Sequence, residues 1–154
     1  MNGPTWRPVT VNDVDFMVEL FLALRRQREP DTDLDVEAIV SGTRAATIEQ
    51  AEGRLEDSVT YVIELAGTPI GRLRIVRTDS MLEIAGLQIH PTYQGRGVGT
   101  AVVSAHVREA QTLQVPTMLG VDKDNPDARR LYLRLGFTDI AETETEYRMA
   151  AGHG

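Results

Sequence analysis

The stretch from Tyr93 to Val103 reads YQGRGVGTAVV, and the interpretation of the whole chain starts from it. Three glycines alternate there, at Gly95, Gly97 and Gly99, and an apolar run with helical spacing follows at once. Glycine costs conformational entropy on folding, so glycines cluster before a helix where the backbone must approach something closely. A strand that turns through glycines into a helix presents unpaired N–H groups and the positive end of the helix dipole. This arrangement suits a pyrophosphate.

Two common phosphate-binding loops do not match this stretch. A Walker A loop requires G-x-x-x-x-G-K-[ST], and the stretch contains no lysine. The dinucleotide-binding loop requires G-x-G-x-x-G after the first strand of its unit, whereas here the spacing is G-x-G-x-G and the preceding strand comes late in the chain. A plain strand-to-helix turn would need only one glycine. We therefore predict an anion-binding loop of another kind.

The rest of the chain predicts a mixed α/β fold with a largely antiparallel sheet, in the order strand, two helices, three strands, helix, strand, helix and two strands. We expect one domain over residues 1–150 and a disordered tail over 151–154. Apolar periodicity and turn residues place helices at 10–26, 34–54, 98–113 and 125–136, and strands at 5–9, 59–65, 80–91, 115–122, 137–142 and 145–150. A further strand, which follows a turn at residues 66–69, includes Leu73 and Ile75.

Several local patterns support these assignments. Thr10 begins a T-x-x-D helix cap, and Asn125, Pro126 and Gly136 read as the cap, first position and end of a short helix. The strand over 80–91 is apolar on both faces except at Glu83, which is typical of a central strand. In the helix after the glycines, the predicted core face consists of Val98, Ala101, Val102 and Ala105, with His106 solvated.

Composition excludes several classes of function. The net charge is −7 and no Lys/Arg-rich block occurs, which argues against a nucleic-acid partner. The absence of cysteine excludes disulfides, thiolate metal sites and a cysteine nucleophile, and the three histidines show no metal-ligand spacing, so we expect no metal. No signal peptide or membrane-spanning run is seen, and basic residues are nearly all arginine, so we expect a cytoplasmic bacterial protein without membrane contact.

Two motifs, in the right order and spacing, resemble the GNAT acyltransferases. QGRGVG, residues 94–99, matches the Q/R-x-x-G-x-G/A motif with which that family holds the pyrophosphate of acetyl-CoA. NPDARRLYLRLGF, residues 125–137, is similar to the family's N-x(6)-Y and L-Y-x-x-x-G-F signature. The resemblance implies a GNAT fold, with a mostly antiparallel sheet of six to seven strands flanked by about four helices, and an N-acetyltransferase that uses acetyl-CoA as co-substrate.

The resemblance also implies a set of acetyl-CoA-binding residues. The pantetheine arm would pair with the main chain of Leu87 and Ile89, and Asn125 and Arg129 would contribute from the later helix. The pyrophosphate cradle would be lined by Gln94, Gly95, Arg96, Gly97, Val98, Gly99 and Thr100.

Acetyl transfer needs proton transfers, and two residues are candidates for them. Glu83 precedes Gln94 by eleven residues, the place at which some histone-acetylating members of the resembling family carry a catalytic glutamate, so it is the candidate base. Its alternatives are a strand-edge residue or an ion pair with Arg72 or Arg74, and many relatives use water instead. Tyr132 matches the family's tyrosine and is the candidate acid toward the leaving thiolate, although a tyrosine beside an apolar helix stripe is often a packing residue.

The acceptor is an amine that the sequence does not identify, whether aminoglycoside, polyamine, amino acid or protein amine. The acidic loop over 29–35 is expected to attract a cationic amine through Asp31 and Asp33. A non-catalytic acyl-CoA-binding or regulatory domain on the same fold is the competing interpretation, and a generic nucleotide-phosphate binder is a third. A homodimer is left open.

Overall fold

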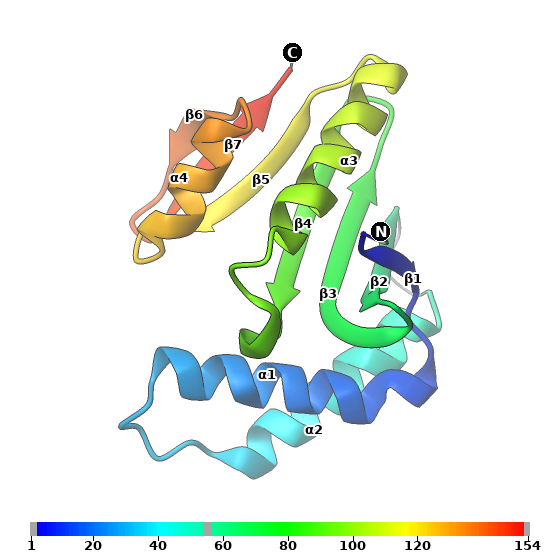
Figure 1. Cartoon of the computed structure of the whole chain (residues 1–154), viewed down its shortest axis with the longest axis vertical. Helices are drawn as coiled ribbons and strands as arrows, with labels where there is room; N and C mark the ends of the chain where they lie inside the picture. Colours follow the sequence, from blue (N-terminus) through cyan, green and yellow to red (C-terminus); the bar gives the residue numbers. More distant parts are fainter. Residues whose placement is uncertain (1–2, 54–56, 153–154) are drawn as a thin grey trace. The chain divides into compact units, whose positions relative to one another are not determined.

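The computed structural model describes residues 3–53 and 57–152, and the order of its elements is the predicted one (Figure 1). The helices are α1 (Val14–Arg28), α2 (Val36–Ala51), α3 (Val98–Leu113) and α4 (Pro126–Arg134). The strands are β1 (Thr5–Pro8), β2 (Ser58–Leu65), β3 (Thr68–Arg77), β4 (Leu82–Ile89), β5 (Thr117–Asp122), β6 (Thr138–Glu142) and β7 (Glu146–Ala151).

Seven strands are hydrogen-bonded in the order β1-β2-β3-β4-β5-β7-β6. β4 is the middle strand, as its apolar character on both faces predicted. It pairs in parallel with β5, with Leu82–Ile84 opposite Thr117–Leu119, whereas β1 with β2, β5 with β7 and β6 with β7 are antiparallel. The predicted mixed α/β class, with a mostly antiparallel sheet and four helices, is confirmed.

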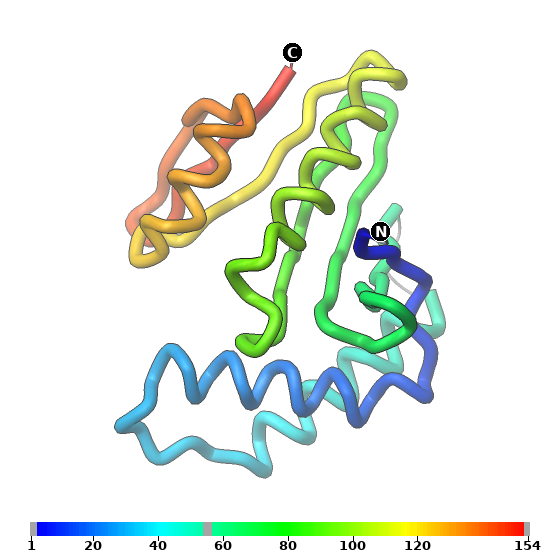
Figure 2. The backbone as a smooth tube through the Cα atoms, viewed as in Figure 1, coloured from blue at the N-terminus to red at the C-terminus, as the bar shows by residue number. Residues whose placement is uncertain are grey.

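The chain forms two compact units, which are described one at a time. The first consists of Met1–Arg74 and Gly86–Val98. In it α1 and α2 run side by side in opposite directions (Figure 2). Met17 and Leu20 of α1 pack in a core with Val9, which follows β1, and with Val62 of β2.

The start of α1 follows the predicted cap. Thr10 and Asp13 form a capping box around a short 3-10 turn that leads into the helix. Arg7 donates to both carboxylate oxygens of Asp13, at 2.9 and 2.8 Å, and also contacts Glu64 at 3.1 Å. The hydrogen bonds from Arg7 lower the pKa of the Asp13 carboxyl, which is buried. These contacts fix the entry of the chain into α1.

The second unit consists of Ile75–Ala85 and Gly99–Gly154, and its core corrects one prediction. In α3 the side chains of Val102, Val103 and His106 are buried, whereas Ala101 is exposed. His106, predicted to be solvated, has its Nδ1 2.7 Å from the Val102 carbonyl oxygen, and burial lowers its pKa. The prediction for this face was wrong because His106 can be buried when its ring has a hydrogen-bond partner, and the helix turns this residue inward instead of Ala101.

The end of the chain follows the prediction only in part. Ala151, assigned to a disordered tail, is the buried last residue of β7 and pairs with Thr117. The rest of the predicted tail falls on Gly152, which follows β7, and on residues 153–154, which lie outside the described residues. The single domain over 1–150 stays a prediction. Within residues 3–53 and 57–152, no helix has the length and apolar character that a membrane span requires.

Candidate functional site

The glycine loop uses its three glycines in two different ways. Gly95 and Gly97 have φ of +74° and +80°, a backbone conformation that L side chains rarely adopt. No heavy atom lies within 4 Å of the place where a Cβ would stand on either residue, so both face open space. Gly99 lies in the first turn of α3 without a positive φ, and a Cβ there would meet Leu131 Cδ2 at 4.0 Å. Two of the glycines therefore shape the loop, and the third does not.

The Gln94 side chain anchors the loop instead of facing outward. Its Nε2 donates to the Ile89 carbonyl at 3.0 Å, and it exchanges a pair of amide hydrogen bonds with Gln27 of α1 at 2.9 and 3.2 Å. The Arg96 guanidinium lies 5.1 Å from the centre of the Tyr93 ring and its residue is exposed. The hydrogen bonds of Gln94 fix the loop to α1 and to the end of β4, and Arg96 gives it an accessible positive charge.

The other predicted acetyl-CoA residues near the loop have distinct surroundings. Leu87 and Ile89 are half-buried on the second half of β4, and the Ile89 carbonyl is occupied by Gln94. Val98, the first residue of α3, is buried, whereas Thr100 is exposed. The backbone N–H groups of the first turn of α3 have no partner within the helix, because such groups would need carbonyls that precede it. The segment from Gln94 to Thr100 thus fits an anionic group at a helix start.

Glu83 is part of an ion-pair network that crosses three strands. Its Oε2 accepts from Arg148 Nη2 at 3.1 Å, and Arg148 Nη1 lies 3.6 Å from Glu146 Oε1. Glu83 is on β4 and Arg148 and Glu146 are on β7, so the side chains reach over β5. Gly120 on β5 makes this possible, because a Cβ there would stand 2.5 Å from Glu146 Oε1 and 2.8 Å from Arg148 Nη1. The cation beside Glu83 is Arg148, which the sequence analysis did not consider.

Tyr132 lies on α4 with its ring against Phe137, at a centroid distance of 5.9 Å and an interplanar angle of 60°. Burial raises the pKa of its hydroxyl above the ordinary value of 10.0. Among residues 3–53 and 57–152 the hydroxyl makes no hydrogen bond. The group therefore stays protonated at neutral pH and keeps its proton available for donation.

Asn125 and Arg129 have structural partners on the same unit. Asn125 Oδ1 accepts from the Ala128 N–H at 3.3 Å, which makes Asn125 the cap of α4 as predicted. Arg129 pairs with Asp139 of β6, and its guanidinium carbon lies 4.4 Å from the centre of the Tyr147 ring. Both residues help to position the helix that carries Tyr132.

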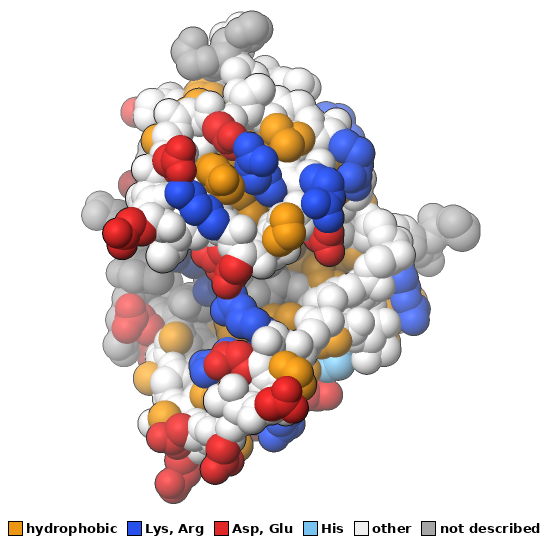
Figure 3. Space-filling view, turned by 90° about the vertical axis from the view of Figure 1, so that its left-hand side faces the viewer, with side chains coloured by type: hydrophobic (Ala, Val, Ile, Leu, Met, Phe, Trp, Pro, Cys, Tyr) orange, Lys and Arg blue, Asp and Glu red, His pale blue; other side chains and the backbone are white. Residues whose placement is uncertain are grey.

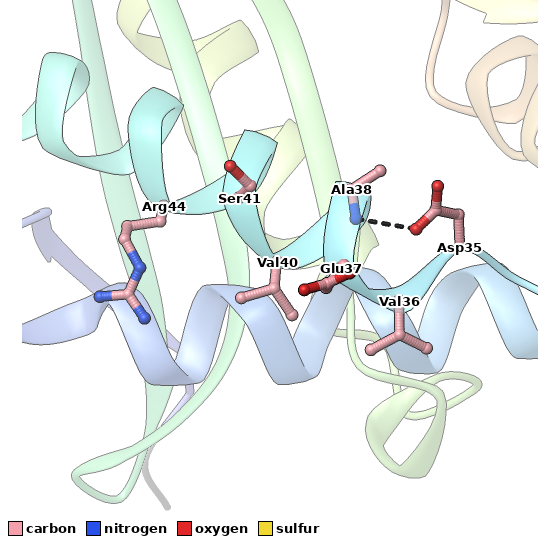
Figure 4. A pocket seen from close by; sticks show the side chains of 7 residues that line it. All are labelled: Asp35, Val36, Glu37, Ala38, Val40, Ser41 and Arg44. Carbon is pink, nitrogen blue, oxygen red and sulfur yellow. Dashed lines mark hydrogen bonds between the residues drawn. The ribbon is translucent and has the colours of Figure 1, made fainter.

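The acidic segment between α1 and α2 divides into paired and unpaired acids. Glu29 pairs with Arg25 at 2.8 Å, and the Asp35 carboxylate accepts from the Ala38 N–H at 3.0 Å as the cap of α2 (Figure 4). Asp31 and Asp33 are exposed, and in the described part of the chain neither has an ion-pair partner. Figure 3 shows acidic side chains gathered in the lower part of that view, over α1 and α2.

Two hollows of the first unit lie beside α2. The larger, of about 700 Å³, is lined, among the described residues, by residues from Asp35 to Arg44 at the first turns of this helix (Figure 4). The smaller, of about 170 Å³, lies between Phe21 of α1, the residues Gly42–Gln50 of α2 and Arg72 of β3. The second is lined by residues of three elements, and Arg72 is the one charged side chain among the described residues that line it.

The structure thus distributes the predicted residues over two units, and it adds contacts that the sequence did not indicate. Gln27 and Arg72 in the first unit, and Arg148 in the second, contact predicted residues or line a cavity. The sequence offered no signal for Gln27 or Arg148, and it named Arg72 only as an alternative ion-pair partner of Glu83, which pairs with Arg148 instead. Within the described residues, no group of three or more His, Cys, Asp or Glu could hold a metal ion.

The model of the acetyltransferase (GNAT) family matches residues 17–137. The chain therefore belongs to the GNAT family, as the sequence motifs predicted, and its enzyme class is that of the acyltransferases.

Two curated relatives match part of the chain. The mycothiol acetyltransferase of Streptomyces avermitilis is 32% identical over 102 residues, which is 64% of this chain and 33% of the relative. The mycothiol acetyltransferase of Streptomyces coelicolor is 33% identical over the same shares. The match thus spans about one third of the length of these relatives.

Solved structures resemble the chain over nearly its full length. The PaiA N-acetyltransferase of Thermoplasma acidophilum in complex with coenzyme A has a TM-score of 0.74 at 15% identity, and the match covers 99% of this chain and 100% of that one. The aminoglycoside acetyltransferase AAC(6')-Ib in complex with paromomycin and acetyl-CoA has a TM-score of 0.75 at 19% identity, over 99% and 94%. At these identities the likeness shows the fold.

Proposed function

We propose that the protein is an N-acetyltransferase that moves the acetyl group of acetyl-CoA to a primary amine by direct attack in a ternary complex. The observation that carries this proposal is the loop from Gln94 to Gly99, in which Gly95 and Gly97 adopt positive φ directly before α3. Acetyl-CoA supplies an activated acyl group as its thioester. With no cysteine in the chain, an acyl-enzyme on that residue cannot form, and direct attack is the economical route.

The loop residues hold the pyrophosphate in this proposal. The backbone N–H groups around Gly95, Gly97 and Gly99 and the start of α3 supply hydrogen bonds, and Arg96 adds a positive charge. Leu87 and Ile89 contribute main-chain groups toward the pantetheine arm, with the Ile89 carbonyl shared with Gln94. Asn125 and Arg129 act mainly by holding α4, and they contribute to acetyl-CoA binding from there.

Tyr132 is the proposed proton donor to the leaving thiolate, because its hydroxyl is kept protonated by burial. An acceptor amine with a pKa near 10.4 costs about 4–5 kcal/mol to deprotonate at neutral pH, so a base or a water relay is also required. Glu83 remains the candidate side chain for this task. Glu83 would have to accept a proton from the amine while its carboxylate is paired with Arg148. This pairing favours a water relay that assists Glu83 or takes its place.

The acceptor belongs among the small-molecule amines in this proposal. The neighbours include AAC(6')-Ib with paromomycin and a spermidine N-acetyltransferase chimera, so the same fold presents amines of several kinds to acetyl-CoA. Asp31 and Asp33 would attract the positive charge of such an amine. We further propose a cytoplasmic bacterial enzyme, in keeping with the two Streptomyces relatives. It acts without a metal or a nucleic acid in this proposal. Light scattering tests whether it forms a homodimer.

A two-part experiment tests the proposal. Calorimetric titration with acetyl-CoA should show binding that weakens when Gly97 is replaced, and a thiol-release assay over a panel of amines should show turnover with at least one. Binding of acetyl-CoA without turnover of any amine would replace the enzyme with a regulatory acyl-CoA-binding domain. Absence of binding would exclude both.

A further inference from the structure

Arg72 is a mostly enclosed guanidinium in the middle of the first unit. It lies on β3, and its Nη1 would stand 2.8 Å from a Cβ at Gly86 of β4, so the missing side chain of Gly86 makes room for it. Nη1 donates to Gln88 Oε1 at 3.0 Å and Nη2 donates to Gln50 Oε1 at 3.3 Å. Its guanidinium carbon lies 5.7 Å from the centre of the Phe21 ring.

All of these partners are neutral. Within residues 3–53 and 57–152, no carboxylate pairs with Arg72, and the nearest charge that acts on it is the like charge of Arg74. Burial and this repulsion lower the pKa of Arg72 to about 10. Removing a charge from water is costly unless an opposite charge compensates it, so an enclosed cation with only neutral partners is uncommon.

The guanidinium faces a cavity instead of a protein carboxylate. The hollow of about 170 Å³ has the volume of roughly five or six water molecules at about 30 Å³ each. Small residues of α2, among them Gly42, Ala46 and Thr47, keep it open, and Phe21 forms an apolar wall. It is smaller than the usual pocket for a whole ligand, about 300–1,000 Å³, and so fits one end of a molecule.

Three other arginines of the chain show the kind of partner that Arg72 lacks, which is a carboxylate. Arg7, Arg77 and Arg148 each face at least one carboxylate at 2.7–3.1 Å. Arg72 donates to two glutamine oxygens instead, and no carboxylate among the described residues faces it. A planar guanidinium fork with unused N–H donors is suited to a carboxylate, which it binds through two parallel hydrogen bonds.

We propose that this cavity binds the carboxylate of the acceptor, so that the substrate class is an amine that also carries a carboxylate, as an amino acid or a peptide terminus does. The inference rests on the proposed function for the acetylated amine, but not for the binding of the carboxylate. Arg72 supplies the charge, Gln50 and Gln88 hold its fork in place, and Phe21 covers its face. A single guanidinium leaves a phosphate dianion half neutralised, which favours the carboxylate.

Binding is tested first without any reaction. Sodium propionate is titrated into the full chain by calorimetry, with propionamide as the neutral isostere and sodium chloride at equal ionic strength as the salt control. We expect propionate to bind at least about tenfold more tightly than propionamide, as for a charged hydrogen-bonded pair. Inorganic phosphate is titrated in parallel, and tighter binding of phosphate than of propionate would overturn the assignment to a carboxylate.

Two variants and one control connect the binding to the cavity. Arg72→Met keeps the volume of the side chain and removes the charge, and Gly42→Leu fills the cavity while Arg72 stays in place. No heavy atom lies within 4 Å of a Cβ at Gly42, so this position in α2 tolerates a side chain without strain. The matched control is Arg74→Met, because Arg74 lies on the same strand as Arg72, donates to Ser58 of β2 at 2.8 Å and is not among the residues that line the cavity. We expect both cavity variants to abolish the preference for propionate and the control to keep it.

Turnover then separates this inference from the proposed function. With an amino acid and its carboxamide as matched acceptors, wild type should prefer the carboxylate by at least about tenfold in kcat/KM, and Arg72→Met should reduce that preference to near one. Acetylation without such a preference would overturn the inference and leave the function standing. If neither of these two acceptors is acetylated but another amine of the panel is, the inference is overturned and the function stands. If no amine of the panel is acetylated, the function fails, and the propionate titration still decides the inference: binding that depends on Arg72 supports it, and no such binding overturns it.

Discussion

Glu83 on β4 and Tyr132 on α4 are equal candidates in the sequence, but their surroundings in the second unit differ. The Glu83 carboxylate already has a cation, since Arg148 Nη2 lies 3.1 Å from it. The Tyr132 hydroxyl makes no hydrogen bond to any described residue, and burial keeps it protonated. The carboxylate is thus neutralised by a cation of the protein, whereas the hydroxyl has a proton and no acceptor for it among the described residues. A group of the second kind is the better candidate for contact with a substrate.

The same distinction applies in the first unit. Glu29 and Asp35 have partners in their own segment, whereas Asp31 and Asp33 do not. Gln94 is occupied by Ile89 and Gln27, whereas the backbone at Gly97 faces open space. If open groups are the functional ones, then substitutions at them should change activity, and substitutions at satisfied groups should change mainly stability.

The largest effect is expected for Tyr132→Phe. This change keeps the ring and its contact with Phe137 while it removes the proton donor, so kcat should fall by about 10²–10⁴ with acetyl-CoA affinity and Tm unchanged. Because burial raises the pKa of the hydroxyl, the wild-type rate should not decline through loss of this proton until the pH exceeds about 10. A pH–rate series with the acceptor found in the amine panel measures both. Turnover equal to wild type would remove Tyr132 from the mechanism.

The next effect is expected for Gly97→Ala. An L side chain at a φ of +80° is strained by about 1–2 kcal/mol, and the loop should distort to relieve it. Acetyl-CoA affinity measured by calorimetry should fall at least tenfold, which corresponds to about 1.4 kcal/mol.

Two glycines serve as controls for that change. Gly67 in the β2–β3 turn has a φ of +82° and open space, so Gly67→Ala imposes the same strain away from the loop and should leave affinity unchanged. Gly99→Ala adds a methyl group without strain and should change affinity less than Gly97→Ala. Equal losses at Gly97 and Gly99 would mean that close approach of the ligand matters and the left-handed conformation does not.

A smaller effect is expected for Glu83→Gln. Because the carboxylate is paired with Arg148, we expect kcat to fall by less than about tenfold, below the usual range for loss of a general base. Part of the loss should be recovered at high pH, where the free amine accumulates. A loss as large as that of Tyr132→Phe, recovered fully at high pH, would establish Glu83 as the base in spite of its ion pair and would break the distinction drawn above.

The smallest effect is expected for the double change Asp31→Asn and Asp33→Asn. These exposed acids act through long-range attraction, so the acceptor KM should rise by about threefold to tenfold with kcat little changed, and added salt should reduce the difference. The matched control is Glu29→Gln, which removes an acid that already pairs with Arg25. An equal rise in KM for the control would show that only net charge matters.

The parts of the molecule that local sequence determines were predicted well. The caps at Thr10 and Asn125 depend on residues a few positions apart, and both were predicted correctly. The pairing of Glu83 with Arg148 joins residues 65 positions apart and depends on the register of β4, β5 and β7. His106 was missed for a related reason, because the pattern predicts a polar residue on a helix to be solvated unless its partner is known. Arg72 was named only as an alternative partner of Glu83, whereas it donates to Gln50 and Gln88.

Gly120 gives the molecule a point at which the charge environment of Glu83 can be adjusted from a distance. A methyl group at this position would collide with the ends of the Glu146 and Arg148 side chains, which are flexible, and not with backbone. Gly120→Ala would therefore displace the guanidinium and uncover the carboxylate on β4 at little cost in folding. Substitutions at residue 120 would thus change the acid–base chemistry of Glu83, although residue 120 itself has no functional group.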